Sequence, residues 1–459
     1  MNIIIAGAGK VGVTLAEHLA AEDHSVTVID VNEETLRKVS NQLDVMCIKG
    51  NCASQAILRQ AGAADADILI AATDSDEINI LCCHCAHQIG VSYTVARVRS
   101  NEYIADVQGL KHDLGINMII NPELAAAEEI SLLLRFPSAA NIDTFARGRV
   151  EIVSFRIQES DNLNAKSLSS LSSRIRDLPI LFCAVERSGK VYIPNGSFVL
   201  AKGDKVYTAG TPAGINQFFR LLGRDNHKVR TTFIIGGGRI AFYLLGILER
   251  LGLSCKLVER NEGRCRQLAE HFTKSIIIHG DGTDPELLTE ERMPSSDAFI
   301  ALTDRDEDNL IISLYAHQSG VSKVIAKSSR QNYSSIARSA GLESVVSPKL
   351  TTAYEILRTV RAIQNSKGNV MTALYKIADG HAEAMEFTVG PSTQYLGVPL
   401  KALKLKKGIL IAVIVRGSQV IIPEGSTCMQ EGDTVIVVAK DSGILDLNAI
   451  YADGFGTGG

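Results

Sequence analysis

The sequence predicts an α/β protein made by tandem duplication, in which each half holds a Rossmann-like, doubly wound parallel-sheet domain followed by a small α+β domain. Three observations favour this fold class. The two halves of the 459-residue chain repeat the same motifs in the same order. Short apolar runs alternate with helical patterns early in each half, and paired apolar runs surround a turn late in each half.

The internal repeat extends over nearly the whole chain. IIAGAGKVG at 4–12 matches FIIGGGRIA at 233–241, and ATDSDEINIL at 72–81 matches LTDRDEDNLI at 302–311. VYIPNG late in the first half corresponds to VIIPEG late in the second. Because a chain of this length is too long for one hydrophobic core, the repeat indicates that a two-domain unit occurs twice.

The first part of each half alternates strands with helices. Helical patterns lie between the strands, such as Val11, Leu15 and Leu19 on one helix face. This alternation predicts a parallel, doubly wound sheet. In the first half, the predicted strands are residues 3–6, 26–30, 45–49, 68–72, 93–97 and 118–121.

The last part of each half has a different pattern. Residues 180–196 and 409–425 each contain two apolar runs around a short turn, which predicts antiparallel hairpins. A polar stretch at 223–228 joins the halves, and the glycine-rich tail at 453–459 is predicted to be disordered. The predicted domains are 1–135 and 231–362 for the Rossmann-like type, and 139–222 and 366–453 for the small type.

The composition limits the expected partners and location. A net charge of −4 does not indicate nucleic-acid binding or a polybasic membrane anchor. Apolar runs such as 409–415 are far shorter than the ~20 residues that span a bilayer. We expect no secretory signal peptide, and nine cysteines without a disulfide-type spacing indicate free thiols. The sequence therefore predicts a cytoplasmic protein.

The first repeat opens with a strand that runs into Gly7-Ala8-Gly9-Lys10-Val11-Gly12, the spacing of a dinucleotide-binding turn. Gly7 permits a tight turn, Gly9 lets the backbone approach a pyrophosphate, and Gly12 lets the helix lie close to the strand. The helix N-terminus then offers N–H groups to phosphates. Asp30 is placed to accept both ribose hydroxyls and to repel a 2′-phosphate, which favours NAD(H) or adenine nucleotides over NADP(H). The alternative is a Rossmann fold whose glycines serve packing alone.

The second repeat carries a modified form of this site. It reads Gly236-Gly237-Gly238-Arg239-Ile240-Ala241, with alanine at the third glycine position. Glu259 takes the place of Asp30, and Arg260 beside it is placed to reach a 2′-phosphate. Arg239, opposite Lys10, is placed to touch phosphate where the helix begins. The loops GNCA and GDGT after the third strands also differ, so the two clefts are expected to differ in ligand preference.

Two further features recur at the carboxyl edge of each sheet, where ligands bind in open α/β sheets. Thr73-Asp74 and Thr303-Asp304 follow the fourth predicted strand, either as ribose or phosphate contacts or as N-caps of the next helix. Arg97 and Lys327 end the fifth predicted strand, where each either binds phosphate or forms a surface salt bridge.

Metal binding and catalysis are not favoured. Cys82, Cys83, His84, Cys85 and His87 lie on one predicted helix, which places only two possible ligands on a face, whereas a closed zinc site needs four. The second repeat has isoleucine, serine, leucine and tyrosine at 312–315, the positions equivalent to 82–85, which indicates helix packing. The chain has no nucleophile elbow, Walker lysine motif or zinc-protease motif, so we expect a protein that is not an enzyme.

Taken together, these motifs resemble the RCK/KTN family (regulator of potassium conductance). The resemblance is carried by IIIAGAGKVG with Asp30, by TDSDEIN, by ARVRS at 96–100 and by NPE at 121–123, with their second-half counterparts. It covers almost the whole chain. It implies two RCK units in one chain, as in the cytosolic regulatory subunits of Trk potassium uptake systems.

The resemblance also implies a function. RCK domains pair and form a ring of eight beneath a membrane protein. Two units per chain therefore imply a homotetramer, docked peripherally on a TrkH-type potassium-translocating subunit at the inner face of the cell membrane. NAD(H), with ATP or ADP as alternative ligands, would bind the clefts and change the shape of the ring. The implied contacts are Gly7, Ala8, Gly9, Lys10, Val11, Gly12, Asp30, Thr73, Asp74 and Arg97 in the first half, and Gly236, Gly237, Gly238, Arg239, Ile240, Glu259, Thr303, Asp304 and Lys327 in the second.

Two expectations stay open at this level. Some members of the family bind a cation through the glutamate of NPE, which is Glu123 here, and a surface glutamate is the alternative. The second copy has Lys349 in that place, so only the first copy is a candidate. The rival function is an NAD-dependent oxidoreductase with an unusual pair of Rossmann-like domains, which would oxidise NADH where a regulator would only bind it.

Overall fold

The fold is that of a computed structural model, which describes residues 1–100, 103, 109, 111–171, 175, 177–224, 228–364, 371–440 and 443–452. The tail at 453–459 and positions 225–227 of the predicted connecting stretch lie outside the described residues. In the described ranges, no helix is long and apolar enough to cross a membrane.

The first Rossmann-like sheet has six parallel strands in the order β3-β2-β1-β4-β5-β6. Its central strands are continuous apolar runs because helices cover both faces, as the sequence predicted. The strands are β1 (Asn2–Ala6), β2 (Ser25–Asp30), β3 (Met46–Lys49), β4 (Ile68–Ala71), β5 (Tyr93–Arg97) and β6 (Met118–Ile120). The helices are α1 (Lys10–Ala20), α2 (Glu33–Gln42), α3 (Gln55–Gln60), α4 (Asp76–Ile89) and α6 (Pro122–Arg135), with a 3-10 turn at Ala63–Asp65.

The second Rossmann-like sheet repeats this order as β14-β13-β12-β15-β16-β17, again wholly parallel. Its strands are β12 (Thr231–Ile235), β13 (Ser254–Glu259), β14 (Ile276–His279), β15 (Ala298–Ala301), β16 (Lys323–Lys327) and β17 (Ser344–Val346). Its helices are α9 (Arg239–Arg250), α10 (Glu262–His271), α11 (Pro285–Glu290), α12 (Asp306–Gln318), α13 (Gln331–Ser339) and α14 (Pro348–Gln364), with a 3-10 turn at Met293–Ser295.

The two small domains are antiparallel five-stranded sheets with matching strand orders, β10-β9-β11-β8-β7 and β18-β19-β22-β20-β21. The predicted hairpins are present as β9–β10 and β20–β21. The strands are β7 (Asn141–Phe145), β8 (Val150–Arg156), β9 (Ile180–Arg187), β10 (Lys190–Tyr192), β11 (Lys205–Gly210), β18 (Met371–Ile377), β19 (Ala382–Thr388), β20 (Ile409–Arg416), β21 (Gln419–Ile421) and β22 (Thr434–Ala439). Helix α8 (Pro212–Leu221) covers the first sheet, and 3-10 turns occur at Ala146–Gly148, Leu168–Ser170, Ala378–Gly380, Leu400–Ala402 and Leu447–Ile450. This confirms the predicted fold class.

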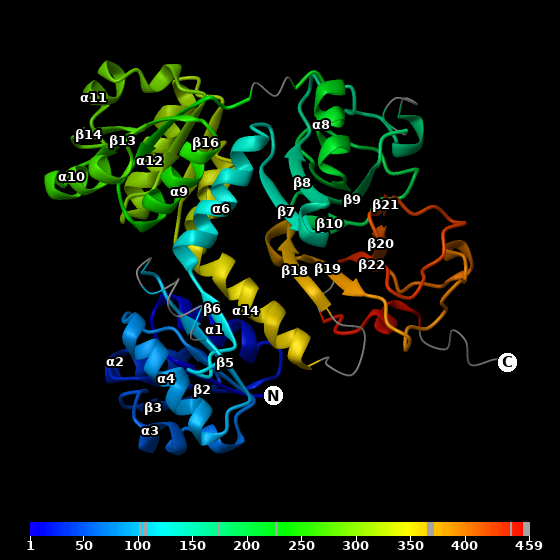
Figure 1. The fold of residues 1–459 in the computed structure, drawn as a ribbon. Coiled ribbons are helices and arrows are strands. Elements are labelled where there is room, and N and C mark those ends of the chain that lie inside the picture. Colours follow the sequence, from blue (N-terminus) through cyan, green and yellow to red (C-terminus); the bar gives the residue numbers. More distant parts are fainter. Residues whose placement is uncertain are drawn as a thin grey trace.

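The two Rossmann-like domains exchange their last helices. α6 leaves the first sheet and packs against α9, where Ala126 and Ile130 share a buried cluster with Leu244. α14 leaves the second sheet and packs against α1, where Ile356 shares a buried cluster with Leu15. Figure 1 shows α6 in cyan reaching the second domain and α14 in yellow running to the first. Each sheet is therefore completed by a helix from the other unit.

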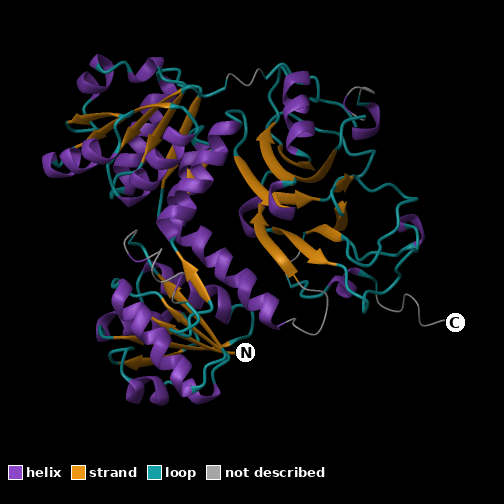
Figure 2. Ribbon diagram, viewed as in Figure 1, coloured by secondary structure: helices purple, strands orange, loops and turns teal. Residues whose placement is uncertain are grey.

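The two small sheets also pack on each other. Phe145 and Cys183 of the first share one buried cluster with Ala384 and Val413 of the second. Figure 2 shows these two sheets together on the side of the molecule opposite the Rossmann-like domains. The two repeats therefore form one body, held by helix exchange on one side and by sheet packing on the other.

Candidate nucleotide-binding site

Each glycine loop follows the central strand at which the strand order of its sheet reverses. The first loop lies beside the end of β4, and the second lies beside the end of β15. Gly7 follows β1 with a φ of +105°, and a Cβ on it would come within 2.9 Å of the backbone of Ala72 and Thr73 after β4. Gly236 follows β12 with a φ of +91° and meets the backbone of Leu302 and Thr303 in the same way. This is the crevice in which open α/β sheets bind their ligands.

The other two glycines of the first loop differ as the motif predicts: Gly12 is closely packed, and Gly9 faces open space. A Cβ on Gly12 would overlap the carbonyl oxygen of Gly7, so helix α1 lies against the turn. A Cβ on Gly9 would meet nothing within 4 Å, and the same holds for Gly238 in the second loop. Gly9 and Gly238 thus leave open space at the N-termini of α1 and α9, where helix N–H groups face outward. The exposed side chains of Lys10 and Arg239 begin these helices.

The carboxylates at the ends of β2 and β13 are oriented by the loops themselves. Asp30 accepts hydrogen bonds from the backbone N–H groups of Ala8 at 2.6 Å and Asn32 at 2.8 Å. Glu259 accepts the equivalent bonds from Gly237 at 2.6 Å and Asn261 at 2.7 Å. These bonds fix the position of each carboxylate before a ligand binds. Each carboxylate oxygen keeps a further lone pair that can accept a hydrogen bond from a ligand hydroxyl.

The threonines after β4 and β15 are tied down by asparagines that the sequence analysis did not single out. Thr73 donates its N–H and its hydroxyl to Asn79 Oδ1 at 2.9 and 2.7 Å, and Asn79 Nδ2 donates to the carbonyl oxygens of Thr73 and Arg97. Thr303 and Asn309 repeat this arrangement. The shared asparagine in TDSDEIN and TDRDEDN was the available signal. These asparagines join the ends of two neighbouring strands at the crevice.

The N-cap alternative for Asp74 and Asp304 is wrong. Ser75 caps α4, and its hydroxyl accepts from the N–H of Ile78 at 3.2 Å. The N-cap position of α12 is Arg305, whose side chain makes no capping hydrogen bond. Asp74 and Asp304 are instead fully exposed, with side chains 99% and 107% accessible. Asp74 lies within 4 Å of Arg97 at the end of β5, and Asp304 lies within 4 Å of Lys327 at the end of β16, because these basic side chains face the same crevice.

Those basic residues, Arg97 and Lys327, are mostly buried at the same edge. Arg97 lies 3.8 Å from Asp74 and 3.4 Å from Glu123, and Lys327 lies 3.7 Å from Asp304. Burial lowers the pKa of Arg97 and of Lys327 despite these acidic neighbours. A charged phosphate at this edge would offset the lost hydration, so the salt bridge and the phosphate contact are compatible roles.

Glu123, the candidate cation ligand, lies at the start of α6. One carboxylate oxygen faces Arg97, and the other is buried without a hydrogen-bond partner among the described residues. Those residues contain no group of three or more His, Cys, Asp or Glu side chains able to hold a metal ion. Cation binding through Glu123 stays a prediction.

The cysteine-rich segment is part of helix packing, as predicted. Cys82 and Cys83 are fully buried on α4 against the first sheet, and burial raises the pKa of the Cys83 thiol. All nine cysteines are free.

The second cleft differs from the first at its ribose end. Arg264 of α10 donates through Nε to the carbonyl oxygen of Gly237 at 2.7 Å, and Thr35 occupies the equivalent position of α2. In the GDGT loop, Asp281 accepts a hydrogen bond from the N–H of Thr283 at 2.9 Å, as Asn51 accepts one from Ala53 at 3.0 Å in the first copy, so a carboxylate replaces an amide at this position. Arg264 was not predicted from the sequence, because the first repeat has Thr35 and not an arginine at the matching position.

The two clefts are linked by one tyrosine. Tyr243, one turn inside α9 of the second unit, accepts a hydrogen bond from Asn121 Nδ2 at 2.8 Å and donates to the carbonyl oxygen of Arg99 at 2.7 Å. Asn121 is the N-cap of α6, and Arg99 follows the strand that ends at Arg97. The helix that begins at the second glycine loop therefore contacts the edge of the first cleft.

The chain matches the TrkA-N domain family at residues 3–122 and 232–348, and the TrkA-C domain family at 152–223 and 384–451. It is 33% identical over 463 residues to Trk system potassium uptake protein TrkA homolog 2 of Methanosarcina mazei, covering 98% of this chain and 100% of that protein. It is 32% identical over 449 residues to Trk system potassium uptake protein TrkA of Haemophilus influenzae, with 96% of each covered.

Two solved structures share the fold. The GsuK channel bound to NAD superposes with a TM-score of 0.62 at 19% identity, covering 96% of this chain and 77% of that one. The GsuK bound to ADP superposes with a TM-score of 0.51 at 16% identity, covering 80% and 70%. These relatives are potassium uptake proteins and channels, and the chain, like them, is not an enzyme. Two TrkA-N and two TrkA-C domains, with full-length relatives above 30% identity, show that the chain belongs to the TrkA family of Trk system potassium uptake proteins.

Proposed function

We propose that this chain is a nucleotide-sensing regulatory subunit that binds NAD(H), ADP or ATP in its two clefts and controls potassium uptake through a TrkH-type membrane protein. The observation that carries the proposal is the pair of open glycine loops, each with a carboxylate held 2.6 Å from a loop N–H group. Structures that share the fold were solved with NAD and with ADP, which supports these two ligand classes.

Regulation requires that a ligand bind one arrangement of the units better than another. Tyr243 supplies a physical contact through which the occupied second cleft would act on the first. The different ribose ends favour different ligands, because Arg264 adds a positive charge only beside the second loop. We therefore infer that the two clefts prefer different nucleotides.

Each chain would contribute four domains, at 1–135, 139–222, 231–362 and 366–453. Four copies of the chain would form a homotetrameric ring in the cytoplasm, peripheral on the inner face of the membrane. Exposed apolar side chains at equivalent positions support assembly through helices. Leu81 on α4 and Ile311 on α12 are 48% and 67% exposed, and Ile336 on the neighbouring α13 is 58% exposed. Large apolar side chains that share one face of repeated domains are typical of protein–protein contacts.

The decisive test of ligand binding is calorimetric titration of the full chain with NADH, NAD, ADP and ATP. Two classes of site are expected, one lost in Asp30→Ala and the other in Glu259→Ala, because each removes the carboxylate of one cleft. Asp113→Ala, at an aspartate whose side chain is 78% exposed, is the matched control and should bind as wild type. NADH should remain reduced throughout. Absence of binding at millimolar concentrations of all four nucleotides would show that the glycines serve packing alone.

The assembly is tested separately by light scattering after size-exclusion chromatography. Leu81→Lys and Ile311→Lys should each shift the tetramer to smaller species, because a buried, unpaired ammonium destabilises an apolar interface. Ile276→Lys places the same change at an exposed isoleucine on the edge strand β14 and should leave the mass unchanged. Tetramers of unchanged stability in both helix variants would exclude this face as the interface.

A further inference from the structure

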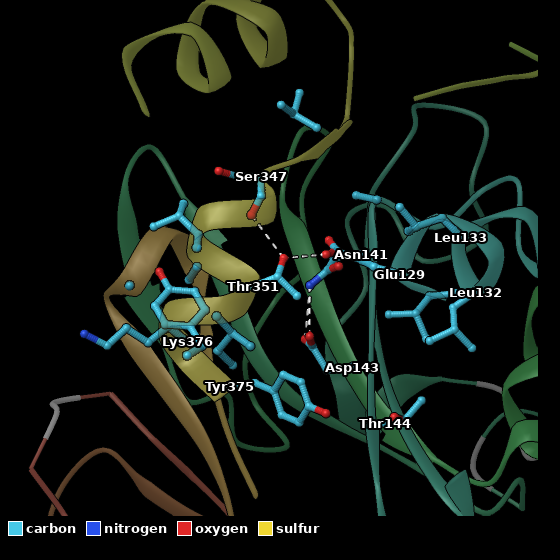
Figure 3. A pocket seen from close by; sticks show the side chains of 18 of the residues that line it. Glu129, Leu132, Leu133, Asn141, Asp143, Thr144, Ser347, Thr351, Tyr375 and Lys376 are labelled. Atoms are coloured by element: carbon cyan, nitrogen blue, oxygen red, sulfur yellow. Dashed lines mark hydrogen bonds between the residues drawn. The ribbon is translucent and has the colours of Figure 1, made fainter. Parts of the chain in front are cut away.

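A cavity of about 670 Å³ lies between the two units, away from both glycine loops. Its walls come from α6 and β7 of the first unit and from α14 and β18 of the second, which are equivalent elements of the repeat. Figure 3 shows side chains from all four elements turned toward one space. The cavity therefore exists only while the two units keep this arrangement.

Two carboxylates form one wall of this cavity. Glu129 of α6 accepts a hydrogen bond from the Thr351 hydroxyl of α14 at 2.8 Å, and Asp143 of β7 accepts from Asn141 Nδ2 at 3.1 and 3.2 Å. Both donors are neutral. Of the ion pairs within 4 Å that the described residues form, none includes Glu129 or Asp143.

Burial opposes the charge of these acids. It raises the pKa of Glu129 to about 7, and burial together with the neighbouring Glu129 raises the pKa of Asp143 to about 7. Burial also raises the pKa of Glu128 and of Glu355, which line the same cavity. The charge of Lys205 acts on Asp143 in the opposite direction and offsets the effect of burial only in part. Desolvated carboxylates that lack an ion-pair partner within 4 Å bind a cation favourably, because its charge replaces the hydration that they have lost.

The size and geometry of the cavity favour an organic cation over a metal ion. The described residues hold no group of three or more carboxylate, His or Cys side chains that could bind a metal, and the volume lies in the range of small-molecule sites. The ring of Tyr375 lies beside Asp143 and offers an aromatic face to an alkylammonium group.

Basic residues restrict the charge of the ligand. Lys205, Arg338 and Arg358 also line the cavity. The ammonium of Lys376 points away from Glu129 and Asp143 (Figure 3). A ligand with one or two ammonium groups on a short carbon chain fits a cavity that has both acidic and basic side chains in its walls. A highly charged polycation would be repelled by Lys205, Arg338 and Arg358.

We propose that this cavity binds a small alkyl diamine, with an ammonium group held between Glu129 and Asp143. Because the walls come from both units, the bound diamine stabilises the observed arrangement of the two repeats and disfavours any arrangement that separates α6 from α14. The site is separate from the glycine loops, so the proposal does not depend on nucleotide binding.

The test is calorimetric titration of the full chain with 1,4-diaminobutane in potassium chloride of constant ionic strength. One molecule is expected per chain, and Glu129→Gln and Asp143→Asn should each weaken binding by about tenfold or more, because each removes a charged acceptor. Glu34→Gln, at a glutamate whose side chain is 78% exposed on α2, is the matched control and should bind as wild type. Thermal melts of each variant verify that the chain is folded.

Three results would overturn the proposal. The first is absence of heat with the diamine for wild type. The second is equal affinity for wild type and both cavity variants. The third is binding of magnesium chloride alone that is lost in the same variants and that displaces the diamine, since this would assign the carboxylates to a metal ion. Asp30→Ala should retain diamine binding, which separates this test from that of the nucleotide clefts.

Discussion

Gly9 and Gly12 belong to one motif but have opposite surroundings. The backbone at Gly9, with φ −72° and ψ −175°, is extended and open to an alanine, and a Cβ there has no neighbour within 4 Å. Gly12 lies against the Gly7 carbonyl, where a Cβ has no room. Gly9 leaves space for a ligand, and Gly12 lets helix α1 lie close to the strand. The residues therefore separate a binding role from a packing role.

This separation makes a prediction for a matched pair of variants. Gly9→Ala should change the free energy of unfolding by less than about 0.5 kcal/mol and weaken nucleotide binding, because its methyl group enters only the ligand space. Gly12→Ala should cost about 1–3 kcal/mol, because helix α1 must move outward. Chemical denaturation and calorimetry measure the two quantities. Ala241 shows that the fold accepts alanine at the position equivalent to Gly12, so a folded protein is expected. Equal losses of stability in both variants would contradict the assignment.

The exchanged helices α6 and α14 carry equivalent arginines in their last turns, and the two side chains have different environments. Arg361 of α14 is 1% exposed and binds Glu22 at 2.6 and 2.9 Å and Glu383 at 3.1 Å. Glu22 follows α1 and Glu383 lies in β19, so one guanidinium joins the first Rossmann-like domain to the second small domain. Arg135 of α6 is 44% exposed and, among the described residues, forms one ion pair, with Glu151 at 3.0 Å.

The two arginines should therefore differ in their effect on stability. Arg361→Met should cost about 3–5 kcal/mol, because it leaves the fully buried Glu383 without its counter-ion. Arg135→Met should cost about 1–2 kcal/mol, because burial already raises the pKa of Glu151 and that group can take up a proton. Urea unfolding of the full chain compares them. A larger loss in Arg135→Met than in Arg361→Met would show that the three-residue cluster does not hold the units together.

At the scale of the whole molecule, the junction between the units contains buried ionisable groups of both signs. Lys323 donates to the Ala139 carbonyl oxygen at 2.6 Å and to Ser344 Oγ at 2.8 Å, and burial lowers its pKa to about 7. Glu129 lies at the same junction with a pKa raised to about 7. We therefore expect the stability of this junction to change with pH near neutrality.

The sign of this dependence follows from proton binding. Folded Glu129 holds its proton up to a pH of about 7, against an ordinary value of 4.5, so its contribution to stability is present below pH 4.5 and lost as the pH rises through 7. Glu129→Gln should flatten the decline between those values and be more stable than wild type above pH 7. Thermal melts from pH 4 to 9 measure this. A wild-type and a variant profile that run parallel would contradict the shift.

Lys323 has the opposite effect in a different window. The unfolded chain binds its proton more tightly, so its contribution to stability rises with pH between about 7 and 10.5. Lys323→Met should remove the part of that rise that lies between pH 7 and 9 in the same melts and leave their acid limb unchanged, which makes it the control for Glu129→Gln.

The amino-acid pattern was enough to predict the duplication, the parallel and antiparallel sheets, the two glycine loops and the carboxylates Asp30 and Glu259. These features depend on the spacing of residues within one strand, turn or helix, and local backbone geometry follows from such spacing. The roles of Gly9 and Gly12 belong to this class, since both are set within a single turn.

The contacts between elements of the two repeats could not be predicted in this way. The exchange of α6 and α14, the contact of Tyr243 with the first cleft, the pairing of Arg361 with Glu22 and the cavity around Glu129 all join residues far apart in the chain. The N-cap prediction for Asp74 failed for a local reason instead, because the adjacent Ser75 caps the same helix end. Helix patterns show that a helix has an apolar face but not which sheet that face will cover, since the hydrophobic effect has no direction and the partner is chosen by packing of the whole molecule.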